Sequence, residues 1–175
     1  MPFTNHHHLI FLIGFMGCGK TTLGRKLAKR IGYDFIDLDE ELEKHVGMSI
    51  TDYFREHGEV KFRKVEAETL KQAAYPKRAV VSTGGGLPCF FDNMDWMNNN
   101  GRTFYVKLPA KTLADRLEHG KANRPMLHGK QGAALIAFID EKLTEREVYY
   151  SQATYIAEGI NLTAEKAEEI ISGSD

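Results

Sequence analysis

The stretch GFMGCGKTT, residues 14–22, combines three glycines, a lysine and two threonines in a spacing that could hold phosphate. Its order from Gly14 to Thr21 is G-x-x-x-x-G-K-T, the pattern of a phosphate-binding loop. The glycines would let the backbone curl, so that successive N–H groups point at phosphate oxygens. Lys20 could reach the outer phosphates, and the hydroxyl of Thr21 could bind Mg²⁺. The pattern predicts a nucleotide site formed by Gly14, Gly17, Cys18, Gly19, Lys20, Thr21 and Thr22.

The elements on either side of this loop fit the same interpretation. The apolar run HLIFLIGF precedes it, as expected for a strand that is buried on both faces. Leu23, Leu27 and Ile31 follow at helical spacing, and Gly32 provides a stop signal. A glycine-rich turn with a chance lysine is the alternative, but a strand before the loop and a helix after it favour nucleotide binding.

Strand and helix signals alternate along the rest of the chain. Further strands are predicted in YDFIDLD, RAVVSTGGG, TFYVKLP and, more weakly, ATYIAEG. Helices are predicted at 49–56 and 59–74, joined at Gly58, and near 92–99, 111–118, 132–151 and 163–172. This alternation predicts an α/β fold with a mainly parallel sheet. The polar, glycine-flanked stretch 119–132 is predicted to be a mobile loop.

Two carboxylates end the second predicted strand, in FIDLD. Ligands of open α/β sheets bind at the carboxyl ends of the strands. Because Asp37 and Asp39 are separated by one residue, their side chains would share a face of that strand. One could serve Mg²⁺ and the other a substrate hydroxyl. The alternative is that the pair caps a helix that starts here.

Two further features bear on the second substrate. Arg63 follows Gly58 on a predicted helix, where a solvated helix face is the ordinary explanation of an arginine. The third strand ends in Gly84, Gly85 and Gly86, and three glycines would let the backbone approach a small molecule closely. Neither feature is specific by itself.

The overall composition limits the kind of protein and its partners. The chain has 175 residues and a formal net charge of −1, which fits one globular domain over 1–175 and favours neither nucleic acid nor an anionic membrane. The two cysteines form no CxxC pair, as expected in a reducing cytoplasm. The apolar run 9–15 is too short to span a bilayer. We therefore predict a cytoplasmic protein.

Taken in order, the segments of the chain resemble the shikimate kinase family. The similar segments are the phosphate loop, FIDLDEELE, GEVKFRKVE, VVSTGGG, NRPML and LTEREVYYSQA, which together span about residues 9–153. The resemblance implies a three-layer P-loop kinase fold, with a five-stranded parallel sheet flanked by helices. It also implies a helical substrate-binding subdomain at about 38–70 and a lid at about 119–132. Members of the family transfer the γ-phosphoryl of ATP to the 3-hydroxyl of shikimate, with Mg²⁺, on the way to chorismate and the aromatic amino acids.

The resemblance also implies a role for individual residues. Asp39 resembles the acid that holds the 3-hydroxyl and accepts its proton, and Asp37 the one that supports Mg²⁺ together with Thr21. Arg63 and Arg146 resemble the arginines that bind the substrate carboxylate, beside the backbone of Gly84, Gly85 and Gly86. Arg124 resembles the lid arginine that acts on the transferring phosphate opposite Lys20, and Arg116 the arginine that packs on adenine. The stretch Cys89 to Phe91 has no role in this resemblance.

Other functions remain open at the level of sequence. A gluconate or nucleoside monophosphate kinase would share the scaffold, although paired arginines favour a small carboxylate. A non-catalytic nucleotide-binding regulator would not need an acceptor acid. We expect small-molecule partners only, ATP and shikimate, and a monomer. Cys18 has two interpretations, a reactive thiolate beside Lys20 and a helix N-terminus, or a small side chain packed in the core.

Overall fold

The fold is built on five parallel strands in the order β2-β3-β1-β4-β5. The computed structural model describes residues 8–120, 127 and 129–173. The strands are β1 (His8–Ile13), β2 (Asp34–Asp37), β3 (Arg78–Ser82), β4 (Arg102–Lys107) and β5 (Tyr155–Glu158). The five-stranded parallel sheet predicted from the sequence is confirmed, including its weak fifth strand.

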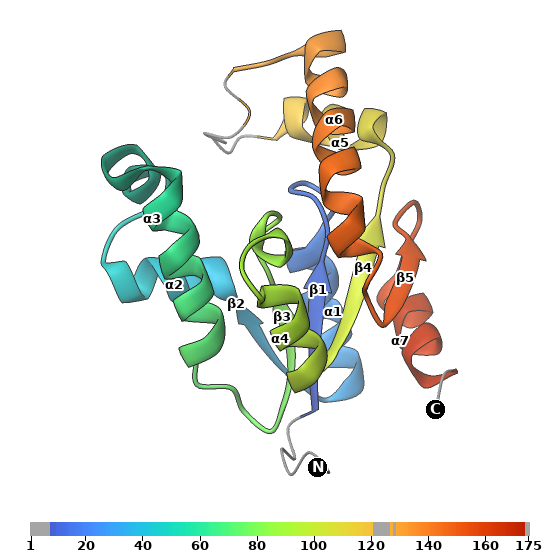
Figure 1. The fold of residues 1–175 in the computed structure, drawn as a ribbon. Coiled ribbons are helices and arrows are strands. Elements are labelled where there is room, and N and C mark those ends of the chain that lie inside the picture. Colours follow the sequence, from blue (N-terminus) through green and yellow to red (C-terminus); the bar gives the residue numbers. More distant parts are fainter. Residues whose placement is uncertain (1–7, 121–126, 128, 174–175) are drawn as a thin grey trace.

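Helices connect the strands and cover both faces of the sheet. They are α1 (Lys20–Ile31), α2 (Leu38–Val46), α3 (Ile50–Gln72), α4 (Asn93–Asn100), α5 (Ala110–His119), α6 (Gly132–Tyr150) and α7 (Ala164–Ser172), with a 3₁₀ turn η1 (Leu87–Cys89). The six helices predicted between residues 49 and 172 are present within a few residues of the expected bounds. Their arrangement around the sheet is visible in Figure 1.

Alternate residues of the strands face two separate apolar cores. Ile10 and Leu12 of β1 pack with residues of α1, α5 and α7, whereas Leu9, Phe11 and Ile13 pack with residues of α3, α4 and η1. Because successive side chains of a strand point to opposite faces, this division shows that the sheet is covered on both sides. The three-layer arrangement predicted from the sequence is therefore confirmed.

The strand order places β1 where the connections change direction. Its neighbours are β3 on one side and β4 on the other, so the chain leaves β1 for β2 at one edge and later returns to the opposite half of the sheet. A crevice forms at such a switch point, beyond the carboxyl ends of the strands. Residues 14–19 follow β1 directly and lie at this crevice.

A helical unit formed by α2 and α3 lies on the β2 side of the sheet (Figure 1). It has a small apolar core of its own, centred on Leu42, Phe62 and Val65. Inside α3, Gly58 has φ 78° and ψ 172°, a conformation that only glycine adopts readily. The predicted break between two helices at Gly58 is confirmed. This unit, residues 38–72, covers the range of about 38–70 that the family resemblance implies for the substrate-binding subdomain.

The second predicted strand is shorter than expected, and one inference drawn from it is wrong. Strand β2 ends at Asp37, and Asp39 lies in the first turn of α2. The Asp37 carboxylate accepts the Asp39 N–H at 2.9 Å and so caps the helix. The two carboxylates therefore do not share a strand face. The helix-capping alternative is correct for Asp37, because an N-terminal backbone donor needs an acceptor.

Half of the lid that the resemblance implies at 119–132, residues 121–126 and 128, lies outside the described residues. Its two ends are the C-terminus of α5 and the N-terminus of α6, which lie beyond the C-terminal end of β4 (Figure 1). None of the helices in the described part of the chain is both long and apolar enough to span a membrane.

Candidate active site

The phosphate loop ends in a helix whose N-terminus has no side-chain cap. Gly19 is the N-cap of α1 with φ 94°, and among the described residues no side chain caps the backbone N–H groups of its first turn. By contrast, Asp37 and Ser49 cap α2 and α3 with their side chains. The first N–H groups of α1 therefore remain available as donors, and the positive end of the helix dipole adds to them. This is an anion-binding geometry.

Lys20 lies within the loop rather than extending from it. Its Nζ donates to the carbonyl oxygens of Gly14 at 2.7 Å and Phe15 at 3.2 Å, and it lies 3.6 Å from Cys18 Sγ. Both Lys20 and Cys18 are buried. A phosphate that replaced these carbonyl acceptors would gain a charge-assisted hydrogen bond from the ammonium group.

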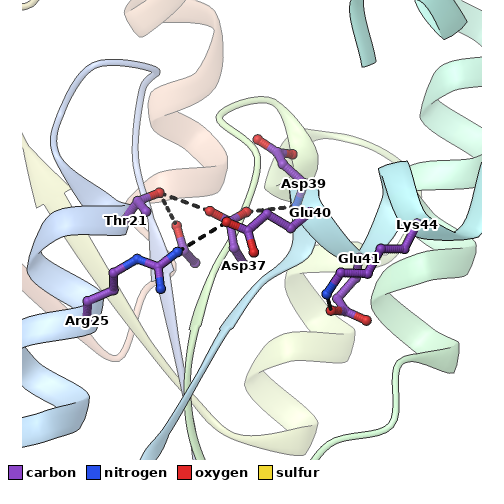
Figure 2. A network of polar contacts seen from close by, with 8 residues as sticks. Thr21, Arg25, Asp37, Asp39, Glu40, Glu41 and Lys44 are labelled. Atoms are coloured by element: carbon purple, nitrogen blue, oxygen red, sulfur yellow. Dashed lines mark hydrogen bonds and ion pairs between the residues drawn. The ribbon is translucent and has the colours of Figure 1, made fainter. Parts of the chain in front are cut away.

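Thr21 and Asp37 meet at the edge of the loop (Figure 2). Thr21 Oγ1 donates to Asp37 Oδ2 at 3.1 Å and lies 3.5 Å from the hydroxyl of Ser82. One carboxylate and two hydroxyls form a cluster of oxygen donors, which suits Mg²⁺, because this ion binds through few protein ligands and keeps water and phosphate oxygens. The residues predicted to hold the metal are thus in contact with each other.

A cavity of about 100 Å³ lies next to the loop, between α3 and the end of β3. It is lined by Met16, Asp39, Ile50, Phe54, Phe62, Arg63, Glu66, Gly84, Gly85, Gly86 and Arg146. Every residue that the sequence assigned to the second substrate lies in this lining. A larger hollow of about 830 Å³ lies near the N-terminal ends of β1 and β4, and it contains none of the predicted site residues. The smaller cavity is therefore the candidate for an acceptor site.

Both arginines of the cavity are buried, although their side chains are cationic. Arg63 is 5% exposed and Arg146 is 7% exposed. Arg63 Nε and Arg146 Nη1 make no hydrogen bond within the described part of the chain. The explanation of Arg63 as part of a solvated helix face is therefore wrong. Since a buried donor without an acceptor costs free energy, these two groups are candidate donors to an anionic ligand in the cavity.

Glu66 is a residue of the site that sequence reasoning missed. Its carboxylate is buried and accepts Arg63 Nη1 at 3.0 Å. Burial, with a smaller contribution from the charge of Asp39, raises the pKa of Glu66 to about 7, although Arg63 and Arg146 oppose the shift. The available signal was its position three residues after Arg63 on one helix, which places the two side chains on the same face.

The glycines after β3 are required because side chains approach their backbone. A Cβ atom on Gly86 would lie 2.6 Å from Arg63 Nη1, and one on Gly84 would lie 2.7 Å from Glu66 Oε2. A Cβ atom on Gly85 would lie 3.0 Å from the backbone nitrogen of Met16. The glycine segment therefore lies between the phosphate loop and the buried charges, where it can contact both substrates.

Two other predicted residues belong to the nucleotide side. Arg116 on α5 reaches back to the loop, with Nη1 3.3 Å from the carbonyl oxygen of Cys18 and 3.5 Å from that of Gly17. Thr22 is exposed in the first turn of α1. Arg124 lies outside the described residues.

The fold and the loop define the class of this protein as a P-loop phosphotransferase, with a second cavity beside the loop that contains buried charged side chains. A family model described as shikimate kinase matches residues 16–173. The chain therefore belongs to the shikimate kinase family.

Individual relatives give the same result. A shikimate kinase of Parabacteroides distasonis is 42% identical over 165 residues, which cover 94% of this chain and 95% of that relative. The crystal structure of shikimate kinase from Bacteroides thetaiotaomicron matches with a TM-score of 0.88 at 37% identity, over 94% of this chain and 98% of that one. The structure of shikimate kinase from Acinetobacter baumannii in complex with shikimate matches with a TM-score of 0.85 at 31% identity, over 98% of this chain and 96% of that one.

The raised pKa of Glu66 predicts how stability depends on pH. Since its pKa is about 7 in the folded protein and 4.5 in an ordinary carboxyl, the folded state holds more protons between these values. The free energy of unfolding should therefore fall as pH rises from about 4.5 to 7. Urea unfolding of Glu66→Gln should lack this decrease, which amounts to at most about 3 kcal/mol. The control is Glu68→Gln, a change at an exposed neighbour, which should retain the decrease in the free energy of unfolding. Parallel plots of unfolding free energy against pH for wild type and Glu66→Gln would contradict a raised pKa of Glu66.

The burial of Cys18 decides between its two interpretations in favour of packing. Cys18 is 4% exposed and belongs to the apolar core beside α1. We expect iodoacetamide at neutral pH to leave Cys18 unmodified in the folded protein and to modify it after unfolding in urea, as measured by mass spectrometry. Cys89 serves as the internal comparison, because burial raises the pKa of its thiol to about 11. Rapid labelling of native Cys18, slowed by ADP, would establish the reactive interpretation instead.

Proposed function

We propose that this protein transfers the γ-phosphoryl of ATP to the 3-hydroxyl of shikimate, giving shikimate 3-phosphate and ADP, on the way to chorismate. One observation carries the assignment of the acceptor: two buried arginines, each with an N–H group that makes no hydrogen bond to the described residues, line one cavity with an acid, Asp39, beside a phosphate-binding loop. Such a cavity suits a small molecule that has a carboxylate at one end and a hydroxyl at the other.

The carboxylate of the acceptor would bind between Arg63 and Arg146. A guanidinium group can pair with a carboxylate through two parallel hydrogen bonds, which fixes orientation as well as charge. Glu66 accepts a hydrogen bond from Arg63, and the ring of Phe15 lies 5.1 Å from Arg146 Cζ. Each arginine therefore has a partner in the protein that helps to position it. The ring hydroxyls would lie against the backbone of Gly84, Gly85 and Gly86.

Asp39 is the proposed general base. Figure 2 shows its carboxylate turned away from Asp37, and a Cβ atom on Gly84 would lie 3.3 Å from its Oδ1. Asp39 therefore faces the glycine segment, where the acceptor hydroxyl would lie. Phosphoryl transfer has a loose transition state, so this acid has only to orient the hydroxyl and accept its proton.

On the donor side, the phosphates of ATP would lie on the N–H groups of the loop and of α1. Lys20 would exchange the carbonyl oxygens of Gly14 and Phe15 for a phosphate oxygen. Thr21 and Asp37 would hold Mg²⁺, which neutralises phosphate charge when bound. We also propose that Arg116 contacts the nucleotide and that Arg124, in the lid, acts on the transferring phosphate.

Two rival functions make different use of these residues. A nucleoside monophosphate acceptor has no carboxylate to meet Arg63 and Arg146, and a non-catalytic nucleotide binder has no need of Asp39. Gluconate has a carboxylate and is the closer competitor. A coupled assay of ADP release with shikimate, gluconate and AMP side by side tests all three, and we expect turnover with shikimate alone. We further propose that the enzyme is a cytoplasmic monomer.

The role of Asp39 can be tested by Asp39→Asn. This change keeps the size of the side chain but removes its charge and its ability to accept a proton, so kcat should fall by roughly two orders of magnitude or more. Affinity for ATP should change little. The control is Glu40→Gln, which alters the next residue of α2, where an exposed carboxylate pairs with Arg25 at 3.1 Å. Near-normal turnover by Asp39→Asn would exclude the carboxylate as the base.

The two arginines can be tested with a ligand that lacks the charge. Arg63→Ala and Arg146→Ala should each weaken shikimate binding by roughly 2–5 kcal/mol, the usual cost of breaking a desolvated charge pair. Arg146→Lys should rescue only part of this loss, because an ammonium cannot bind a carboxylate bidentately. The carboxamide of shikimate should bind wild type and both alanine variants with similar, low affinity. Equal losses for the acid and the amide would assign the arginines to the fold, and the exposed Arg25→Ala is the control.

A further inference from the structure

Phe90 lies directly against the guanidinium group that is proposed to bind the substrate carboxylate. The centre of its ring is 4.3 Å from Arg63 Cζ, and the ring of Phe62 lies 5.2 Å from the same atom. Phe90 belongs to the stretch Cys89 to Phe91, to which neither the sequence nor the proposed mechanism gave a role. Its distance from Arg63 is well within the range of a cation–π contact.

The backbone around Phe90 is held in a defined shape. Cys89 N–H donates to the carbonyl oxygen of Gly86 at 3.0 Å, and the buried amide of Asn93 donates to that of Leu87 at 2.9 Å. The next residue, Phe91, has φ 51° and is 62% exposed. A positive φ is costly for a bulky side chain. This turn directs two consecutive phenylalanines to different environments, with Phe90 half-buried and Phe91 in solvent.

Arg63 has few other contacts that fix the plane of its guanidinium group. Among the described residues, only Glu66 makes a hydrogen bond of ordinary length to this group, at Nη1. Glu59 lies 3.5 Å from both Nε and Nη2, and Nε makes no hydrogen bond within the described residues. An aromatic face stabilises the cation and limits its rotation without using an N–H group. The edge of the guanidinium group then remains available for a ligand.

Phe90 also makes little contribution to the apolar cores. The three apolar clusters of the described chain contain its neighbours Leu87 and Cys89 but not Phe90. Its principal partner is therefore a charged side chain of the site. A substitution at Phe90 should consequently affect Arg63 more than it affects folding.

We propose that Phe90 is a positioning residue for the acceptor site, which stacks on the guanidinium group of Arg63 and holds its free edge toward the carboxylate of the substrate. The proposal rests on the proposed function, because it takes Arg63 as the carboxylate ligand. It assigns the selectivity of the site for a carboxylate partly to an aromatic ring that does not touch the substrate.

The first experiment compares two adjacent phenylalanines. Phe90→Leu keeps an apolar side chain but removes the aromatic face, whereas Phe91→Leu makes the same change in solvent. Calorimetry should show a Kd for shikimate that is roughly 3- to 30-fold higher in Phe90→Leu, the fold-change expected if the whole of a usual cation–π contact serves to hold Arg63 in its binding position. Phe91→Leu should match wild type. In steady-state kinetics the KM for shikimate should rise in Phe90→Leu, while kcat and the KM for ATP stay unchanged.

The second experiment separates the electronic role of the ring from its shape. Phenylalanines with one, two and three ring fluorines, incorporated at position 90, keep the ring nearly the same size but withdraw charge from its face. The Kd for shikimate should rise stepwise with each fluorine, and the Kd for its carboxamide should not. Constant affinity for shikimate across this series, or equal effects of Phe90→Leu and Phe91→Leu, would overturn the proposal.

The outcome also distinguishes this inference from the proposed function. If wild type binds shikimate and Arg63→Ala abolishes the preference for the acid over its carboxamide, but the Phe90 variants bind as wild type does, only the role of Phe90 is overturned. If wild type binds neither ligand, the proposed function fails, and the role of Phe90 fails with it.

Discussion

Strand β1 lies at the centre of a parallel sheet and is buried on both faces, and the arrangement of the site depends on where it ends. Because β3 and β4 flank β1 in parallel, the carboxyl ends of these strands lie side by side. The loop after β1 and the glycine segment that follows β3 therefore converge there. The phosphate loop lies at the centre of these strand ends, and a Cβ atom on Gly85 would lie 3.0 Å from the backbone nitrogen of Met16 in that loop. The proposed donor and acceptor sites are therefore adjacent because of the strand order.

Buried charge is the second constraint on the site. Arg63, Glu66 and Arg146 lie next to one cavity with little access to water. Burying a charge is expensive unless it is paired, and these groups are only partly paired with each other. The raised pKa of Glu66 reflects this cost. Such an arrangement sacrifices stability in favour of binding an anion, which would complete the hydrogen bonds of both arginines.

The sequence by itself determined the class of fold and most of the site. The apolar runs, the helical spacing after Gly19 and the glycine break at Gly58 are local signals, and local backbone preferences preserve them in the folded chain. The loop pattern is also local, since its residues are consecutive. The resemblance to shikimate kinases then selected Asp39, Arg63 and Arg146, which all line the same cavity.

Only the tertiary structure decided how these side chains are used. Strand β2 ends at Asp37, which caps α2, so that Asp39 lies in a helix and not in a strand. The carboxylate of Asp39 faces the glycine segment and points away from Asp37. The burial of Arg63, the role of Glu66 and the contact with Phe90 depend on packing between α3 and the segment after β3. The periodicity of one segment cannot predict which residues distant in sequence pack against it. Burial and the pKa of a carboxyl are properties of the assembled fold.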